Sequence, residues 1–211
     1  TILSQLLLSA VALVKMKRDK NAFGFSPSYV SFRRKLTRPM IVQSLPLIIE
    51  RGLMSAGKLM VNSMSTIYGT TTVGALGVSN NLGGFAAAPQ NGFQEGAAAV
   101  ISQNLGAGKT KRIRQGMRSA LVIALVTSVS IAAVMLVFGK VILGWFISGT
   151  PAEVEATLQV AYTYLAVMSV CLPILYILHV TRAAIQGMGN TLLPMASGIA
   201  EFVMRTAAAL I

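Results

Sequence analysis

Charged residues are scarce in this chain. Only 11% of its 211 residues are Asp, Glu, Lys or Arg, whereas 54% are hydrophobic, and the mean hydropathy is +0.68. A soluble domain usually carries about 25% charged residues to cover its surface. The composition therefore excludes an ordinary soluble protein and predicts an all-α integral membrane protein, a polytopic helical bundle.

Cysteine and histidine are almost absent. Cys171 is the only cysteine and His179 the only histidine. An intrachain disulfide is therefore impossible, and a metal site built from Cys and His is excluded. We expect no resident metal ion and no cofactor.

Acidic residues are also few, six against 18 basic ones, which gives a net charge of +12. Such an excess favours nucleic-acid binding in a soluble protein. Here most of the cations form two clusters between apolar runs, at 15–38 and 109–118. Clusters in that position are topology signals that mark the cytoplasmic side. No aromatic and basic reading surface is interleaved, so we expect no nucleic-acid partner.

Long apolar runs define the predicted organisation. Residues 1–14 are too short for a span and fit the end of a preceding transmembrane helix, because a span needs about 20 residues. Residues 15–38 form a basic cytoplasmic connection, in which a surface helix near 27–36 and a solvated loop are equally good interpretations. Residues 39–211 hold transmembrane helices at about 39–68, 72–105, 113–147, 152–181 and 191–211. The chain begins and stops within helices, so we expect a fragment of a longer protein.

Proline and glycine punctuate these runs. Pro46, Pro89 and Pro173 lie inside predicted helices and should bend them. Gly69 and the segment 106–108 are expected to end helices. Pro151, in the first turn of the fourth predicted span, marks a helix start.

Ionisable residues inside the apolar runs are the candidate functional residues, because each costs about 3 kcal/mol to insert into a membrane. Glu50 follows Pro46 by one turn, where the proline opens a polar niche that could hold Na⁺ or a proton. The alternative is that Glu50 pairs with a nearby cation and fixes packing. Lys58 lies two turns beyond Glu50, too far for direct pairing, and is interpreted mainly as structural.

Three further charges fall within predicted spans. Glu95 fits a helix-packing or gating role better than ion coordination. Glu201 and Arg205 are four residues apart with the acid first, which favours an ion pair within one helix. His179 and Arg182 are placed at the inner end of a span, where their side chains would reach toward the interface.

Polar side chains that could line a cavity are scattered over several predicted helices: Asn62, Asn80, Gln94, Tyr162 and Tyr164. The alternative for each is packing or an interhelical hydrogen bond. The 11 methionines suit an adaptable apolar pocket, although core packing explains most of them.

No catalytic constellation is present. GAGKT at 106–110 is similar to a nucleotide-binding loop, but it lacks the first glycine and no strand precedes it. We therefore expect no enzymatic activity.

Several stretches carry a resemblance to a known family. They are LPLIIERGLMSAGKLMVNSMSTIYGTTTVGALGVSNN (45–81), GFQEGAAAVISQNLGAGKTKRIRQG (92–116) and YTYLAVMSVCLPILYILHVTRAAIQGMGNTLLPM (162–195), followed by the Glu201 and Arg205 pair. With them the chain resembles the MATE family, the multidrug and toxic compound extrusion transporters. The resemblance implies the end of helix six, an inter-lobe loop at 15–38, and the C-terminal lobe, truncated at both ends.

The resemblance further implies a multi-pass antiporter of the cell membrane. Such transporters export drugs and organic cations against a Na⁺ or H⁺ gradient by alternating access. The implied partners are the lipid bilayer, small amphipathic or cationic substrates, and the missing N-terminal lobe. One departure matters: Met54 occupies the position where some members carry an acid two turns after the proline.

Two alternatives remain open at this stage. A lipid-linked oligosaccharide flippase of the same broad fold group would need a cationic cavity, which Lys58 and Arg51 keep possible. A structural membrane subunit without transport activity would show no dependence on ion gradients.

Overall fold

The computed structural model describes residues 2–18 and 33–210. Every regular element in these ranges is a helix, as the composition predicts. The chain divides into two units, residues 1–42 and 43–211. In the first unit, α1 (Ile2–Arg18) is an apolar helix that continues into the basic segment. Helix α2 (Arg34–Ser65) begins there and passes into the second unit.

The basic connection predicted at 15–38 is helical at both ends, because α1 continues to Arg18 and α2 begins at Arg34. A terminal run of cations can join a helix when the apolar residues beside it propagate the hydrogen-bonded turns. The surface helix expected near 27–36 lies mostly outside the described residues.

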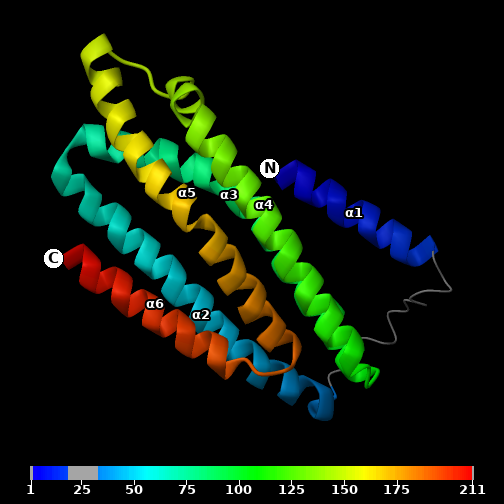
Figure 1. Ribbon diagram of the computed structural model, residues 1–211. Coiled ribbons are helices and arrows are strands. Elements are labelled where there is room, and N and C mark those ends of the chain that lie inside the picture. The colour runs from blue at the N-terminus through cyan, green and yellow to red at the C-terminus, as the bar shows by residue number, and fades with distance from the viewer. Residues whose placement is uncertain (1, 19–32, 211) are drawn as a thin grey trace. The chain divides into compact units, whose positions relative to one another are not determined.

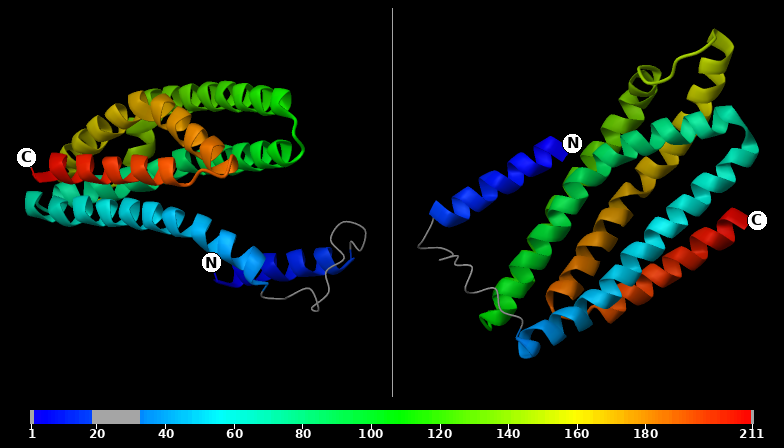
Figure 2. Two further views of the ribbon diagram at one scale, coloured as in Figure 1. Left: turned by 90° about the horizontal axis from the view of Figure 1, so that it is seen from below. Right: turned by 180° about the vertical axis from the view of Figure 1, so that it is seen from behind.

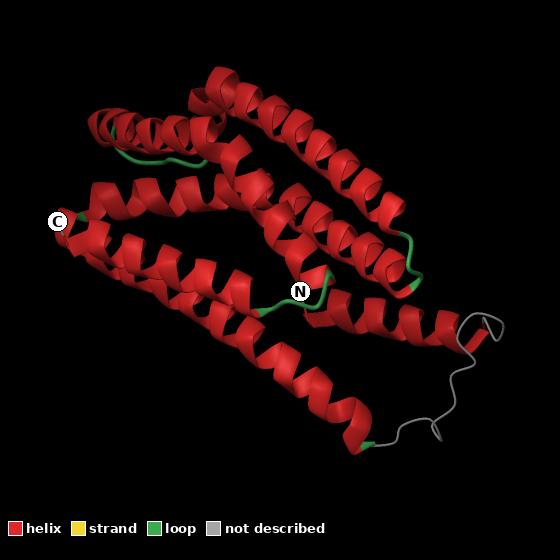
Figure 3. Cartoon of the chain, turned by 60° about the horizontal axis from the view of Figure 1, so that its bottom comes forward, coloured by secondary structure: helices red, strands yellow, loops and turns green. Residues whose placement is uncertain are grey.

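The second unit holds the rest of the described chain. After α2 come a short 3-10 helix η2 (Thr66–Tyr68), α3 (Thr70–Gly106), α4 (Thr110–Gly144), α5 (Pro151–Gly187) and α6 (Leu192–Leu210). Helices α3, α4 and α5 pack together, while α2 and α6 lie side by side along α5 (Figures 1 and 2). The short loops between consecutive long helices are visible in Figure 3.

Glycines make the breaks between these helices. Gly69, Gly108 and Gly189 adopt φ values of +89°, +67° and +86°, a region that residues with a Cβ rarely enter. Helix α5 begins as predicted, with Pro151 in its first turn. The Glu153 carboxylate accepts hydrogen bonds from the backbone N–H and the hydroxyl of Thr150, at 3.1 and 2.6 Å.

The prolines do not end their helices. Helix α3, 37 residues long, contains Pro89, and α5, also 37 residues long, contains Pro173. Helix α5 changes direction in its middle part (Figure 2). It also extends to Gly187, beyond the predicted end at 181.

Small residues let the helices approach closely. Tyr176 of α5 donates a hydrogen bond of 2.6 Å to the Ala86 carbonyl of α3. A Cβ on Gly187 would lie 2.7 Å from the Ala98 carbonyl oxygen, so the α3 and α5 backbones nearly touch. Membrane helices associate through such contacts, because lipid supplies little hydrophobic drive between them.

Two of the described helices, α4 and α5, are long and apolar enough to cross a membrane. Together with the all-helical fold this supports an all-α membrane protein. The sequence predicted three more spans, at the positions of α2, α3 and α6. Helices α2 and α6 carry charges inside their apolar runs, and α3 is rich in Gly, Asn and Gln, which lower its hydropathy.

Candidate functional site

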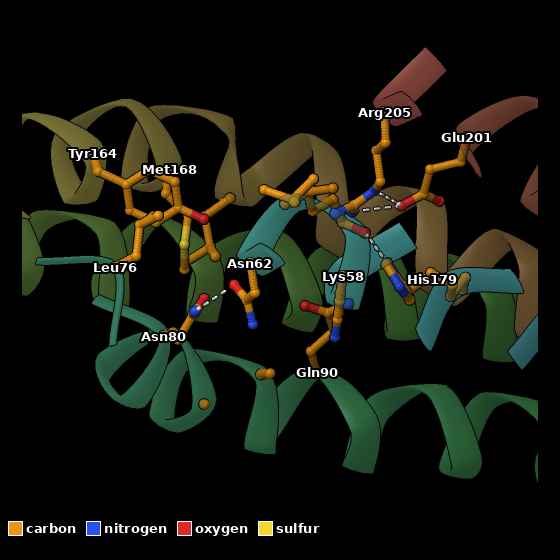
Figure 4. A pocket seen from close by; sticks show the side chains of 17 residues that line it. Lys58, Asn62, Leu76, Asn80, Gln90, Tyr164, Met168, His179, Glu201 and Arg205 are labelled. Atoms are coloured by element: carbon orange, nitrogen blue, oxygen red, sulfur yellow. Dashed lines mark hydrogen bonds and ion pairs between the residues drawn. The ribbon is translucent and has the colours of Figure 1, made fainter. Parts of the chain in front are cut away.

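A cavity of about 460 Å³ lies between α2, α3, α5 and α6. This volume suits a small organic molecule. Its polar lining residues come from all four helices: Lys58, Asn62, Asn80, Gln90, Tyr164, His179, Glu201 and Arg205. Figure 4 shows the charged side chains toward one end of the cavity and Leu76, Tyr164 and Met168 toward the other. The cavity is therefore amphipathic along its length.

The charged end is organised by Arg182 of α5, which is only 4% exposed. Its Nη2 donates to Glu201 Oε2 at 3.0 Å and to Ser197 Oγ at 2.7 Å, both on α6. Its Nη1 lies 4.0 Å from Glu50 Oε1 on α2. One guanidinium therefore joins two acids from two helices.

Glu50 and Glu201 differ in their burial and in their hydrogen-bond partners. Glu50 is 4% exposed, and its Oε2 accepts a hydrogen bond of 3.2 Å from Gln186. Glu201 lines the cavity, and its Oε1 accepts from Arg205 Nη2 at 2.7 Å. We refer to Glu50, Arg182, Glu201 and Arg205 as the ion network.

The backbone of α6 is shaped to admit Glu50. A Cβ on Gly198 would lie 2.8 Å from Glu50 Cγ, a distance that no side chain tolerates without movement. Gly198 is therefore where the acid of α2 enters the surface of α6. Gly57, farther along α2, packs in the same way against Phe202, where a Cβ would lie 3.3 Å from the ring.

The ion network has no net charge, since two carboxylates face two guanidinium groups. Its pairing is incomplete: within the described part of the chain, Arg182 Nη1 is buried without a hydrogen-bond partner. A buried arrangement with an unused donor is costly to maintain and tends to have a functional reason.

The other polar groups of the cavity wall are weakly paired. Asn80 of α3 and Asn62 of α2 are linked by a long amide contact of 3.5 Å. His179 Nδ1 lies 2.9 Å from the Leu175 carbonyl oxygen of its own helix. Among the described residues, none of the ion pairs involves Lys58. Lys58 thus brings an ammonium group to the cavity wall.

The structure brings many of the candidate residues together. Lys58, Asn62, Asn80 and Tyr164 line the cavity with the Glu201 and Arg205 pair, and Glu50 joins them through Arg182 rather than by lining the cavity.

Three candidates lie elsewhere. Tyr162 donates to the Leu136 carbonyl of α4 at 2.9 Å, with Lys140 Nζ 5.0 Å from the centre of its ring. Gln94 is buried in α3, where its Oε1 has no hydrogen-bond partner in the described chain. Glu95 is exposed on α3.

The interpretation of Arg182 as a residue reaching for the interface is wrong. Because α5 continues for more than a turn beyond it, the side chain lies inside the helix bundle and is buried. His179 is likewise part of the cavity wall. A sequence signal for this site did exist. Ser197, Glu201 and Arg205 recur every fourth residue of α6, and Arg182 and Gln186 do the same on α5.

Within the described ranges, no group of three or more His, Cys, Asp or Glu residues could hold a metal ion. The ion network therefore consists of side-chain charges beside a cavity between helices. All four of its residues lie within a segment that matches a family model. That model is MatE, and the match covers residues 46–211.

The chain belongs to the MatE family. Members of this family are membrane transporters rather than enzymes, so the cavity and its ion network belong to a MATE-type transporter fold. No curated protein and no solved structure matches the chain significantly.

Proposed function

We propose that this MatE protein is a secondary active antiporter, which exports amphipathic drugs and organic cations in exchange for Na⁺ or H⁺. The observation that carries the proposal is the ion network at one end of the cavity. It places two acids, Glu50 and Glu201, around one shared guanidinium. No further cofactor takes part, since the coupling ion itself is transported.

Coupling requires a cation that binds two conformations with different affinity. Glu201 is the acid that a cation in the cavity meets first, because it lines the cavity while Glu50 is enclosed. A proton or Na⁺ on Glu201 competes with Arg182 for the same carboxylate. Arg182 then keeps only its 4.0 Å contact with Glu50, and the contact between α5 and α6 weakens.

The consequence is mechanical as well as electrostatic. Arg182 is bonded to Ser197 and Glu201 of α6, so its release from Glu201 loosens α6 from α5. In alternating access, one bundle of helices moves against another around the binding site. We propose that α2 and α6 move as a pair, because Gly57 and Gly198 pack them together.

The proposed transporter spans the cell membrane several times. Its cavity would be completed by an N-terminal lobe of the same protein, as the resemblance implies. In support, Lys58, Asn62 and Asn80 line the cavity and are nevertheless exposed.

The test is efflux of a fluorescent cationic dye from cells that carry the full-length protein. Glu50→Gln and Glu201→Gln are compared with Glu95→Gln, which removes an exposed acid outside the cavity. Sodium and proton gradients are collapsed separately, and the amount and thermal stability of each variant are measured. We expect collapse of one gradient, Glu50→Gln and Glu201→Gln to abolish efflux, and Glu95→Gln to preserve it.

Efflux that survives the collapse of both gradients refutes ion coupling. Equal efflux from Glu201→Gln and the parent, at equal protein level, refutes the role of the network. A structural subunit predicts no efflux from any of them.

A lipid-linked oligosaccharide flippase is the second candidate, because Lys58 places a cation in the cavity wall. An anionic headgroup would pair with that ammonium group. Lys58→Gln would then abolish headgroup translocation. Under the drug-export proposal the same variant keeps or increases export of a cationic dye, because a like charge is removed.

A further inference from the structure

The N-cap and first turns of α4 carry a dense group of cations that the ion network does not use. Lys109, Lys111, Arg112, Arg114 and Arg118 are all exposed, and none takes part in an ion pair among the described residues. The first turn of α4 has no acidic residue either. The helix dipole disfavours cations at this end, so helix stability does not explain them.

Three of these cations share one face of the helix. Lys111, Arg114 and Arg118 are spaced i, i+3 and i+7, which places them within one narrow sector. The opposite face packs on α3, since a Cβ on Gly116 would lie 3.0 Å from a methyl carbon of Val100. The basic face therefore points away from the helix bundle formed by α3, α4 and α5.

The same face becomes apolar immediately beyond Arg118. Val122, Leu125 and Val129 continue the spacing, and they are 54%, 42% and 51% exposed. These residues belong to the more hydropathic of the two helices that could cross a membrane. At about 1.5 Å per residue, Arg118 lies only about 6 Å along the axis from Val122. A row of cations thus stands directly above a stripe suited to lipid chains.

We infer that this face of α4 is a binding surface for an anionic phospholipid. The guanidinium groups of Arg114 and Arg118 and the ammonium group of Lys111 contact the lipid phosphate. The acyl chain lies along Val122, Leu125 and Val129. Arginine suits this role, because its planar fork donates two parallel hydrogen bonds to phosphate oxygens.

The chain provides a matched control for the test. Lys109 and Arg112 are also exposed cations, but Arg112 lies off this face by its helical position, and Lys109 precedes the helix as its N-cap. Arg114→Gln with Arg118→Gln, and Lys109→Gln with Arg112→Gln, remove the same net charge. Only the first pair removes cations that stand above the apolar stripe.

The experiment uses the full-length protein in vesicles of phosphatidylcholine with one tenth phosphatidylglycerol. Electron spin resonance compares the immobilised fractions of spin-labelled phosphatidylglycerol and spin-labelled phosphatidylcholine at the protein surface. Each cation near a headgroup raises association of an anionic lipid by about fivefold. We expect the parent to prefer phosphatidylglycerol, the Arg114 and Arg118 variant to lose at least fivefold of that preference, and the Lys109 and Arg112 variant to keep most of it.

Two results would overturn the inference. If the parent immobilises both lipids equally, the cations only set topology or bind a soluble acidic partner. If the two variants lose the same preference, the attraction is a diffuse property of net charge and not of this face. Thermal unfolding of each variant shows that the protein is folded, and the loss of preference at high salt confirms its electrostatic origin.

Discussion

Substitution of Arg182 should leave Glu50 with less charge compensation than Glu201. Glu201 keeps a second cationic partner in Arg205, whereas among the described residues Glu50 keeps only the neutral Gln186. The side chains of Arg182 and Glu50 are each 5% exposed, so a carboxylate left there is hardly hydrated. Arg182→Gln should therefore destabilise the protein mainly through Glu50.

The size of the destabilisation distinguishes an unpaired buried charge from a lost hydrogen bond. Removing one partner of a buried ion pair costs about 3–5 kcal/mol. Interhelical hydrogen bonds in a membrane protein reach at most about 1.7 kcal/mol. The distance of 4.0 Å between Arg182 and Glu50 is long for an ion pair, so we expect a loss of about 3 kcal/mol.

The assay is reversible unfolding of the full-length protein in mixed micelles, arranged as a double-mutant cycle. Adding Glu50→Gln to Arg182→Gln should recover at least about 1 kcal/mol, because no unpaired buried charge then remains. Adding Glu201→Gln should recover less. Arg51→Gln is the control, since Arg51 is an exposed cation of the same helix as Glu50 and forms no ion pair among the described residues.

The reasoning is refuted if Arg182→Gln costs less than about 1 kcal/mol. It is also refuted if Glu201→Gln recovers more of the lost free energy of unfolding than Glu50→Gln does. Glu201 would then be the carboxylate that Arg182→Gln leaves unpaired. Strict additivity of the substitutions would show that the network holds no coupled charges.

Three further predictions test the packing and the cavity. Gly198→Ala should cost about 1–3 kcal/mol, because the new methyl group meets Glu50, whereas Gly92→Ala, with open space around it, should be neutral or slightly stabilising in the same unfolding assay. Tyr176→Phe should cost about 0.5–1.5 kcal/mol through the lost hydrogen bond to α3, and an unchanged free energy of unfolding would show that the bond contributes nothing. Lys58→Glu should tighten binding of a cationic dye measured by fluorescence titration, and equal affinity in parent and variant would place the dye outside the cavity.

The local pattern of the chain determined the helices and where they break. Apolar runs predicted an all-helical membrane protein, and the glycines at the breaks between α2 and α6 adopt positive φ values. The Glu201 and Arg205 pair was predictable because four residues make one turn, and the structure shows it at 2.7 Å. Such features depend on neighbours within one helix.

Only the tertiary structure decided which helices share the site. The sequence shows that Arg182 has an apolar neighbourhood, but not that its helix continues and buries it. Its partners lie on α2 and α6, which approach each other where Gly198 leaves room for Glu50. Close packing of small residues is a property of paired surfaces, and one helix alone does not specify its partner. Helix faces therefore follow from the sequence, while the ion network at the cavity exists only once those faces have met.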